Sequence, residues 1–197
     1  MDCTVWTIGH SARPLKTLLA LVDHYRIEAV ADVRRFPSSR RQPQFARVAL
    51  DSALAEDGIA YRWIAALGGR RRPQPDSPNT AWRNLQFRGY ADYMASQEFD
   101  EGVDELLEIS GHLRTTMMCA EAVWWRCHRA LIADALCVRG IKVVHIIDEK
   151  RAEMHPYTSP ARIVHGRLSY VATQGKPLKQ ERELASQQLN SPAQLGN

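Results

Sequence analysis

Short apolar runs rich in β-branched and aromatic residues recur along the chain, separated by stretches with helical spacing. The runs predict five strands, at residues 3–8, 27–33, 59–64, 115–119 and 142–147. Helical spacing is clearest at Leu15, Leu18, Leu19 and Val22, which fall on one face of a helix. Further helices are predicted at residues 45–56, 90–109 and 127–138.

Alternation of strands and helices predicts the fold class. The chain is expected to form an α/β fold with a mostly parallel sheet of about five strands and helices on both faces. Residues 163–171 predict a C-terminal edge hairpin around His165 and Gly166. We therefore expect a single domain over residues 1–172, followed by a polar and mobile tail over residues 173–197.

Bulk composition is that of a soluble globular protein, with 45% hydrophobic and 24% charged residues among 197. No apolar stretch approaches the roughly 18 residues that cross a bilayer, so no membrane association is expected. The first residues lack the basic and apolar segments of a signal peptide. Four unevenly spaced cysteines are typical of reduced thiols, so a cytoplasmic location is predicted.

Positive charge is concentrated in two stretches of the chain. Residues 34–47 contain five arginines and no acidic residue, and residues 68–88 contain five arginines and one aspartate. Residues 68–83 also form a long predicted loop, and loops of this length are usually functional or disordered. The arginines could belong to a solvated surface. Because both stretches flank predicted strand ends, they also predict an anionic ligand between them, bound through guanidinium groups.

The densest group of reactive side chains lies at residues 118–129, which read M-C-A-E-A-V-W-W-R-C-H-R. This segment joins a predicted strand to a predicted helix. Ligands of open parallel sheets bind beyond the carboxyl ends of the strands. The ends of three other predicted strands carry polar groups too, namely His10, Ser11, Asp32, Arg34, Arg35 and Asp148. The sequence therefore predicts one shared pocket at this edge.

Several motifs in this chain occur in a recognisable order. They are T-I-G-H-S at residues 7–11, D-V-R-R-F-P at 32–37, L-G-G-R at 67–70, F-R-G-Y-A-D-Y-M at 87–94, M-C-A-E at 118–121, C-H-R at 127–129 and H-I at 145–146. With these motifs the chain closely resembles the domain-of-unknown-function 488 family over roughly residues 4–150. The resemblance implies a family pattern and brings no established reaction with it.

Thiol and acid–base chemistry is the leading functional hypothesis. Cys119 or Cys127 would be the nucleophile or redox thiol, and Glu121 and His128 would transfer protons, with His10 as a further catalytic candidate. The substrate would be anionic, a nucleotide or a nucleic acid. The residues expected to hold it are Ser11, Asp32, Arg34, Arg35, Arg70, Arg88, Tyr90 and Arg129.

Three alternatives remain open at this stage. Either cysteine could be an unreactive buried thiol. Arg70, Trp82 and Phe87 could instead belong to a non-catalytic nucleic-acid-binding module, since arginines and aromatic rings hold phosphates and stack on bases. Finally, the cysteines and His128, with His10 or His145, could bind zinc or iron.

Some enzyme classes have no support in the sequence. Dinucleotide-binding, Walker A and α/β-hydrolase glycine motifs are absent. The loop between Cys119 and Arg126 is too long for a signature phosphatase and lacks the glycines that let backbone amides surround a phosphate. Neither a cofactor nor an oligomeric state is predicted.

Overall fold

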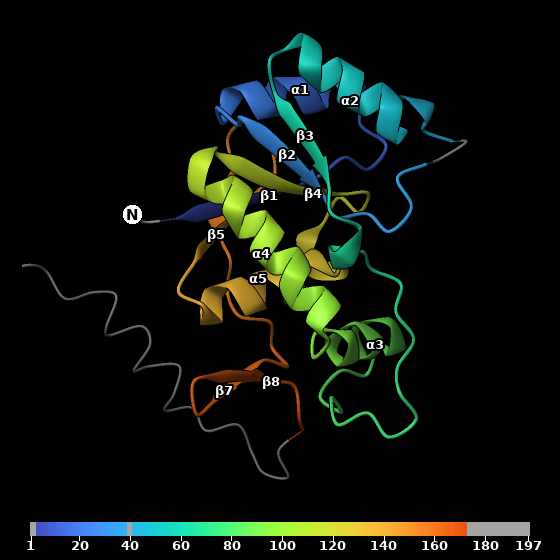
Figure 1. Cartoon of the computed structure of the whole chain (residues 1–197), viewed down its shortest axis with the longest axis vertical. Coiled ribbons are helices and arrows are strands. Elements are labelled where there is room, and N and C mark those ends of the chain that lie inside the picture. Colours follow the sequence, from blue (N-terminus) through green and yellow to red (C-terminus); the bar gives the residue numbers. More distant parts are fainter. Residues whose placement is uncertain (1–2, 39–40, 173–197) are drawn as a thin grey trace, which may run out of the picture.

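A six-stranded sheet forms the centre of the computed structural model, which describes residues 3–38 and 41–172 (Figure 1). Its strands, in chain order, are β1 (Thr4–Gly9), β2 (Ala29–Asp32), β3 (Ala60–Trp63), β4 (Thr115–Cys119), β5 (Lys142–Ile146) and β6 (Ala152–Met154). The spatial order is β3-β2-β4-β1-β5-β6, and only β6 runs antiparallel to its neighbour. The predicted α/β fold with a mostly parallel sheet is confirmed.

Strand register brings three strand ends together. In the parallel sheet β4 lies between β2 and β1, so Cys119 is opposite Gly9 and Met118 is opposite Asp32. The loops that leave β1, β2 and β4 therefore emerge side by side at one edge. The candidate site is built from these loops.

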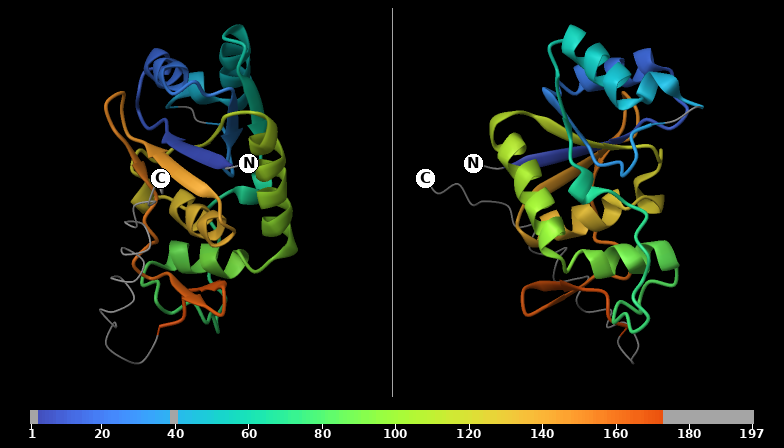
Figure 2. Two further views of the ribbon diagram at one scale, coloured as in Figure 1. Left: turned by 90° about the vertical axis from the view of Figure 1, so that its left-hand side faces the viewer. Right: turned by 45° about the vertical axis from the view of Figure 1, so that its right-hand side comes forward.

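Helices cover both faces of the sheet (Figure 2). On one face, α1 (Leu15–His24) and α2 (Arg47–Glu56) pack Leu18, Leu50 and other apolar side chains against Ile8. On the other face lie α4 (Gln97–His112) and α5 (Arg129–Val138), with α3 (Leu85–Tyr93) beside them. Short 3₁₀ turns occur at η1 (Pro43–Phe45), η2 (Ala65–Leu67) and η3 (Trp124–Arg126).

The single helix predicted at residues 90–109 is wrong. Two helices, α3 and α4, cover this stretch, and they are separated by a turn after Tyr93. The Asn84 side chain caps α3 by accepting hydrogen bonds from two backbone amides. Ser96 caps α4 by accepting one from the amide of Phe99. Serine is a strong N-cap residue, and here it begins a new helix where apolar periodicity alone suggested continuity.

The predicted C-terminal hairpin is confirmed. Strands β7 (Arg162–Val164) and β8 (Arg167–Ser169) pair through a turn in which His165 and Gly166 have φ values of 50° and 75°. This hairpin forms a two-stranded sheet of its own. The antiparallel edge strand of the main sheet is β6. This strand was not predicted from the sequence, because its three residues include few β-formers. The predicted mobile tail lies outside the described residues.

Among the described residues, no helix combines the length and the apolar character needed to cross a membrane.

Candidate functional site

A cavity of about 420 Å³ opens at the edge where β1, β2 and β4 end. Its wall includes two thiols and an imidazole, surrounded by arginines and aromatic rings. The lining residues are Arg34, Arg35, Phe36, Ser38, Gly69, Arg70, Gln86, Phe87, Tyr90, Cys119, Ala120, Glu121, Arg126, Cys127 and His128.

Cys127 and His128 form a thiol–imidazole pair. His128 Nε2 lies 2.9 Å from the carbonyl oxygen of Val33, which can only accept a hydrogen bond, so Nε2 carries a hydrogen. In the neutral ring Nδ1 is then unprotonated, and it lies 3.6 Å from Cys127 Sγ. The pair can therefore exist as a thiol that donates to Nδ1 or as a thiolate that accepts from a protonated ring.

Gly69 makes room for this imidazole. A Cβ atom at position 69 would lie 2.8 Å from His128 Nδ1, closer than side-chain contacts allow. The glycine at this place in the second arginine-rich stretch therefore lets its backbone approach the ring directly. The ring of Tyr90 closes another side, with its centroid 5.1 Å from that of His128.

Arg129 lies beneath the thiols, with 1% of its surface exposed. Its Nε donates to Cys127 Sγ at 3.4 Å, and its Nη2 donates to the carbonyl of Glu121 at 2.5 Å. A third donor, Nη1, lies 3.3 Å from Thr7 Oγ1. Arg129 was predicted to bind the anion, but its donors hold the loop after β4 and the Cys127 sulfur, and it does not line the cavity.

The pKa values of the two thiols are shifted in opposite directions. Burial disfavours the Cys127 thiolate, but the thiol of Cys119, His128 and Arg129 outweigh burial and hold the pKa of Cys127 well below its usual range. For Cys119, the hydrogen bond with Cys127, together with burial, raises the pKa well above its usual range. At neutral pH we expect one thiolate, on Cys127, and one thiol, on Cys119.

A metal ion could be bound by the same group. The ligand atoms of Cys119, Cys127 and His128 all lie within 4.8 Å of one another. Two sulfurs and one imidazole nitrogen are a donor set that suits zinc or iron. The sequence hypothesis also included His10 or His145, and neither belongs to this cluster.

Arg34 lines the cavity, but its guanidinium is already engaged. It donates to both carboxylate oxygens of Asp32 and to the carbonyl of Phe45. Asp32 is fully buried and also accepts a hydrogen bond from Tyr61. This buried ion pair fixes the loop after β2, since a charge without its partner would be costly there. Asp32 was predicted as an anion-binding residue and does not line the cavity.

His10 belongs to the same buried group. Its Nδ1 donates to the carbonyl of Ser11, and its Nε2 accepts from Arg34 at 3.2 Å. Burial, reinforced by the charge of Arg34, lowers the pKa of His10 to about 4. With both ring nitrogens occupied, this neutral side chain supports the loop and has no free nitrogen for the catalytic role that the sequence suggested.

Thirteen site residues were predicted from the sequence, and eight of them line the cavity. Those eight are Arg34, Arg35, Arg70, Tyr90, Cys119, Glu121, Cys127 and His128. Of the other five, Ser11 donates its backbone amide to the carbonyl of Ala120, and Arg88 donates to the carbonyl of Trp82. Lining residues not predicted as ligands include Arg126, Phe36 and Gly69. Phe36 and Gly69 belong to two of the family motifs, and Arg126 belongs to the segment at residues 118–129, but no pattern assigned a binding role to these three side chains.

A second hollow, of about 530 Å³, adjoins the cavity. The two share Arg35, Phe36 and Arg70, and the second adds Arg71 and Arg72. Together they form a continuous arginine-lined surface that leads to the thiols. This surface, defined by Arg35, Arg70, Arg71, Arg72 and Arg126, is called the arginine groove below.

A buried chain of hydrogen bonds leads away from Arg129. Thr7 Oγ1 lies 2.7 Å from His145 Nδ1, His145 Nε2 lies 2.9 Å from His155 Nδ1, and His155 Nε2 lies 2.9 Å from Asp134 Oδ1. One arrangement of hydrogens gives every group in this chain a hydrogen-bond partner. In that arrangement each group donates to the next one along the chain from Arg129 to Asp134. Burial, followed by the neighbouring His155 and Arg129, lowers the pKa of His145 to about 2.

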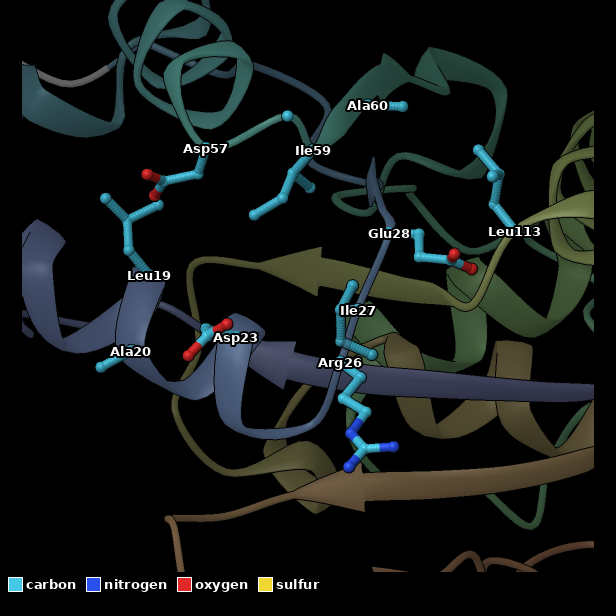
Figure 3. Close-up of a pocket in the computed structure, with 11 residues that line it drawn as sticks. Leu19, Ala20, Asp23, Arg26, Ile27, Glu28, Asp57, Ile59, Ala60 and Leu113 are labelled. Carbon is cyan, nitrogen blue, oxygen red and sulfur yellow. The ribbon is translucent and has the colours of Figure 1, made fainter.

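A larger hollow, of about 760 Å³, lies at the opposite edge of the sheet (Figure 3). It lies beside the first residues of β2 and β3, and its charged groups are Asp23, Arg26, Glu28 and Asp57. Its described lining contains neither a thiol nor an imidazole. We therefore place the candidate site at the smaller cavity.

Comparison with known proteins identifies a family for this chain, but the description of that family names no activity. The model described as "Domain of unknown function DUF488" matches residues 14–136, and the chain belongs to this family. All residues that line the thiol cavity fall inside the matched range. No curated protein and no solved structure matches the chain.

Proposed function

We propose that this member of the DUF488 family is a thiol-dependent enzyme acting on an anionic substrate, either a nucleotide or a nucleic acid. The proposal rests on one observation: Cys127 Sγ lies 3.6 Å from His128 Nδ1 in a cavity surrounded by arginines. Nucleophilic thiols are typically activated in this way, by an adjacent base and by positive charge.

In the proposed mechanism Cys127 is the nucleophile and His128 the acid–base group. The thiol proton moves to Nδ1 of His128, while Nε2 keeps its own hydrogen, which it donates to the carbonyl of Val33. The thiolate attacks the electrophilic atom of the substrate, and Nδ1 returns the proton to the leaving group. Arg129 donates to Sγ before the attack and stabilises the thiolate. Glu121, which is exposed on the cavity wall, would activate the water that releases the product.

The arginine groove would hold the substrate. Arg70 and Arg126 are exposed and have no carboxylate partner among the described residues. Guanidinium groups bind phosphate oxygens bidentately, and the neighbouring rings of Phe36 and Phe87 offer faces on which a base could stack. A nucleotide or a single strand of nucleic acid combines both features.

Thiol reactivity tests the nucleophile. Cys127 is expected to react with iodoacetamide at pH 6–7 at least about tenfold faster than an unperturbed thiol, because its pKa is lowered. Cys127→Ser should abolish this fast phase, and Cys119→Ser should retain it. Cys137→Ser is the matched control, because burial raises the pKa of Cys137 to about 11. Alkylation of both site cysteines with an apparent pKa of about 8.5 or above would contradict the proposal.

Fluorescence anisotropy with labelled single-stranded oligonucleotides tests the substrate class. The Arg70→Ala/Arg126→Ala double variant is expected to bind about tenfold more weakly than the parent protein and to show a smaller salt dependence. Arg162→Ala/Arg167→Ala removes the same charge from the β7–β8 hairpin, outside the cavity, and should change binding little. Equal losses in both double variants would contradict specific binding in the groove.

A metal site is the second candidate, supported by the cluster of Cys119, Cys127 and His128. These residues would hold zinc or iron, and the bound ion would supply Lewis-acid chemistry that polarises the substrate. Elemental analysis of protein purified without a polyhistidine tag should then find about one equivalent, lost in Cys127→Ser. Less than about a tenth of an equivalent would contradict this candidate.

A further inference from the structure

We propose that Cys119 and Cys127 also form a reversible disulfide, and that a hydroperoxide is the oxidant that produces it. The same cavity would then carry a redox activity in addition to the proposed reaction on an anionic substrate. This inference rests on the proposed role of Cys127 as the reactive thiolate, and it adds a role for Cys119.

The two sulfur atoms are held together by fixed parts of the fold. Both belong to the cluster whose ligand atoms lie within 4.8 Å of one another. Cys119 ends β4 within the sheet, and Cys127 lies two residues before the start of α5, directly after η3. Arg129 binds both the Cys127 sulfur and the loop between the two cysteines. The sulfurs can therefore meet without the unfolding of either element.

The chemistry proceeds in two balanced steps. First, the Cys127 thiolate attacks the distal oxygen of the hydroperoxide. The O–O bond breaks, the sulfur becomes a sulfenic acid, and the leaving alkoxide or hydroxide takes a proton from His128. Second, Cys119 loses its proton to His128 and attacks the sulfenic sulfur. The S–S bond forms, the S–O bond breaks, and the leaving hydroxide takes the proton from His128 and departs as water. The peroxide is reduced by two electrons and the two thiols are oxidised by two, and an external dithiol can reverse the change.

Access to the thiols favours a small oxidant. Both cysteines line the cavity, but only 8% of Cys119 and 4% of Cys127 is exposed. Hydrogen peroxide is small enough to reach sulfur through such an opening. It is also uncharged, so its reaction should not depend on the arginine groove. The redox activity and the binding of an anionic substrate can therefore be separated by mutation.

Cys3 and Cys137 lie outside the cavity and are partly exposed. A Cys3→Ser/Cys137→Ser protein removes their background reactions and retains only the two cysteines of interest. It is compared with the parent chain, and it serves as the starting point for the two single variants.

The experiment follows the intact mass of this protein during a titration with hydrogen peroxide. The expected product has lost two hydrogen atoms, remains a monomer on a non-reducing gel, and regains its mass with dithiothreitol. Adding Cys119→Ser should stop the reaction at a sulfenic acid, which dimedone captures as a single adduct. Adding Cys127→Ser should slow oxidation at least about tenfold. Arg162→Ala/Arg167→Ala, which removes two positive charges from the β7–β8 hairpin outside the cavity, should leave the oxidation rate unchanged.

Two results would overturn the redox inference. One is the addition of oxygen atoms to the protein without loss of hydrogen, which means that no disulfide forms. The other is a disulfide between two molecules. Alkylation of the same samples separates the two proposals: fast alkylation of Cys127 without a disulfide overturns only the redox inference. Slow alkylation together with slow oxidation overturns both.

Discussion

Replacing Asp134 by alanine is expected to lower the free energy of unfolding by about 3–5 kcal/mol, because it removes a buried carboxylate together with the hydrogen bonds that this carboxylate accepts. The Asp134 carboxylate is fully buried. It accepts from the ring of His155, from both the amide and the hydroxyl of Thr158, and from the hydroxyl of Tyr170. Alanine would leave these donors without an acceptor in a place that water does not reach.

Chemical denaturation followed by circular dichroism measures this loss. Asp104→Ala is the matched control, because Asp104 is an exposed residue in the middle of α4 and alanine is the better helix former. Asp134→Asn is expected to give an intermediate loss. It keeps the size of the side chain but replaces one acceptor oxygen by an NH₂ group, although the neighbouring groups are hydrogen-bond donors. A loss below about 1 kcal/mol for Asp134→Ala would mean that the buried chain contributes little to stability.

Acidification is expected to destabilise the fold strongly. Lowering the pH from 7 to 5 should reduce the free energy of unfolding by about 4 kcal/mol through His10 and His145 alone. Burial is the main cause that lowers their pKa values, to about 4 for His10 and about 2 for His145, from 6.5 in an unfolded chain. Between pH 6.5 and pH 4 the unfolded chain therefore binds protons at these positions and the folded chain does not. The stabilisation is present above pH 6.5 and is lost as the pH falls toward the folded values.

Urea denaturation at pH 7, 6 and 5 tests this dependence. His10→Gln and His145→Gln should each remove about half of the loss between pH 7 and pH 5, whatever the stability of each variant at pH 7. If either variant fails to fold, the C2–H proton signals of both histidines in the parent protein provide a second measurement. Titration of either ring above pH 6 in the folded protein would contradict the assignment.

Much of the fold could be predicted because it depends on local patterns. Runs of β-formers marked each of the five parallel strands, and glycines after α2 and α5 marked where those helices end. The parallel arrangement then implied that Cys119, Asp32 and His10 lie at one edge of the sheet. The division between α3 and α4 was missed because a single serine cap outweighed apolar periodicity that continued on either side of it.

The partners of the site residues could not be predicted in the same way. Arg34 and Arg129 were expected to face an anion, yet one is engaged by Asp32 and the other lies under the loop after β4. His128 obtains its orientation from the carbonyl of Val33, 95 positions away in the sequence. Contacts of this kind depend on how distant loops pack, and a single sequence carries no periodic pattern for them.

The position of β1 in the sheet has a consequence for dissecting the protein. This strand lies between β4 and β5, but it precedes the range of residues 14–136 that matches the family model. A fragment limited to that range would leave one side of β4 with unpaired amides and carbonyls along a strand of five buried residues. Such an edge is a template for pairing between chains. Excising the matched range would therefore yield an aggregating fragment, and the smallest fragment worth expressing must begin before Thr4.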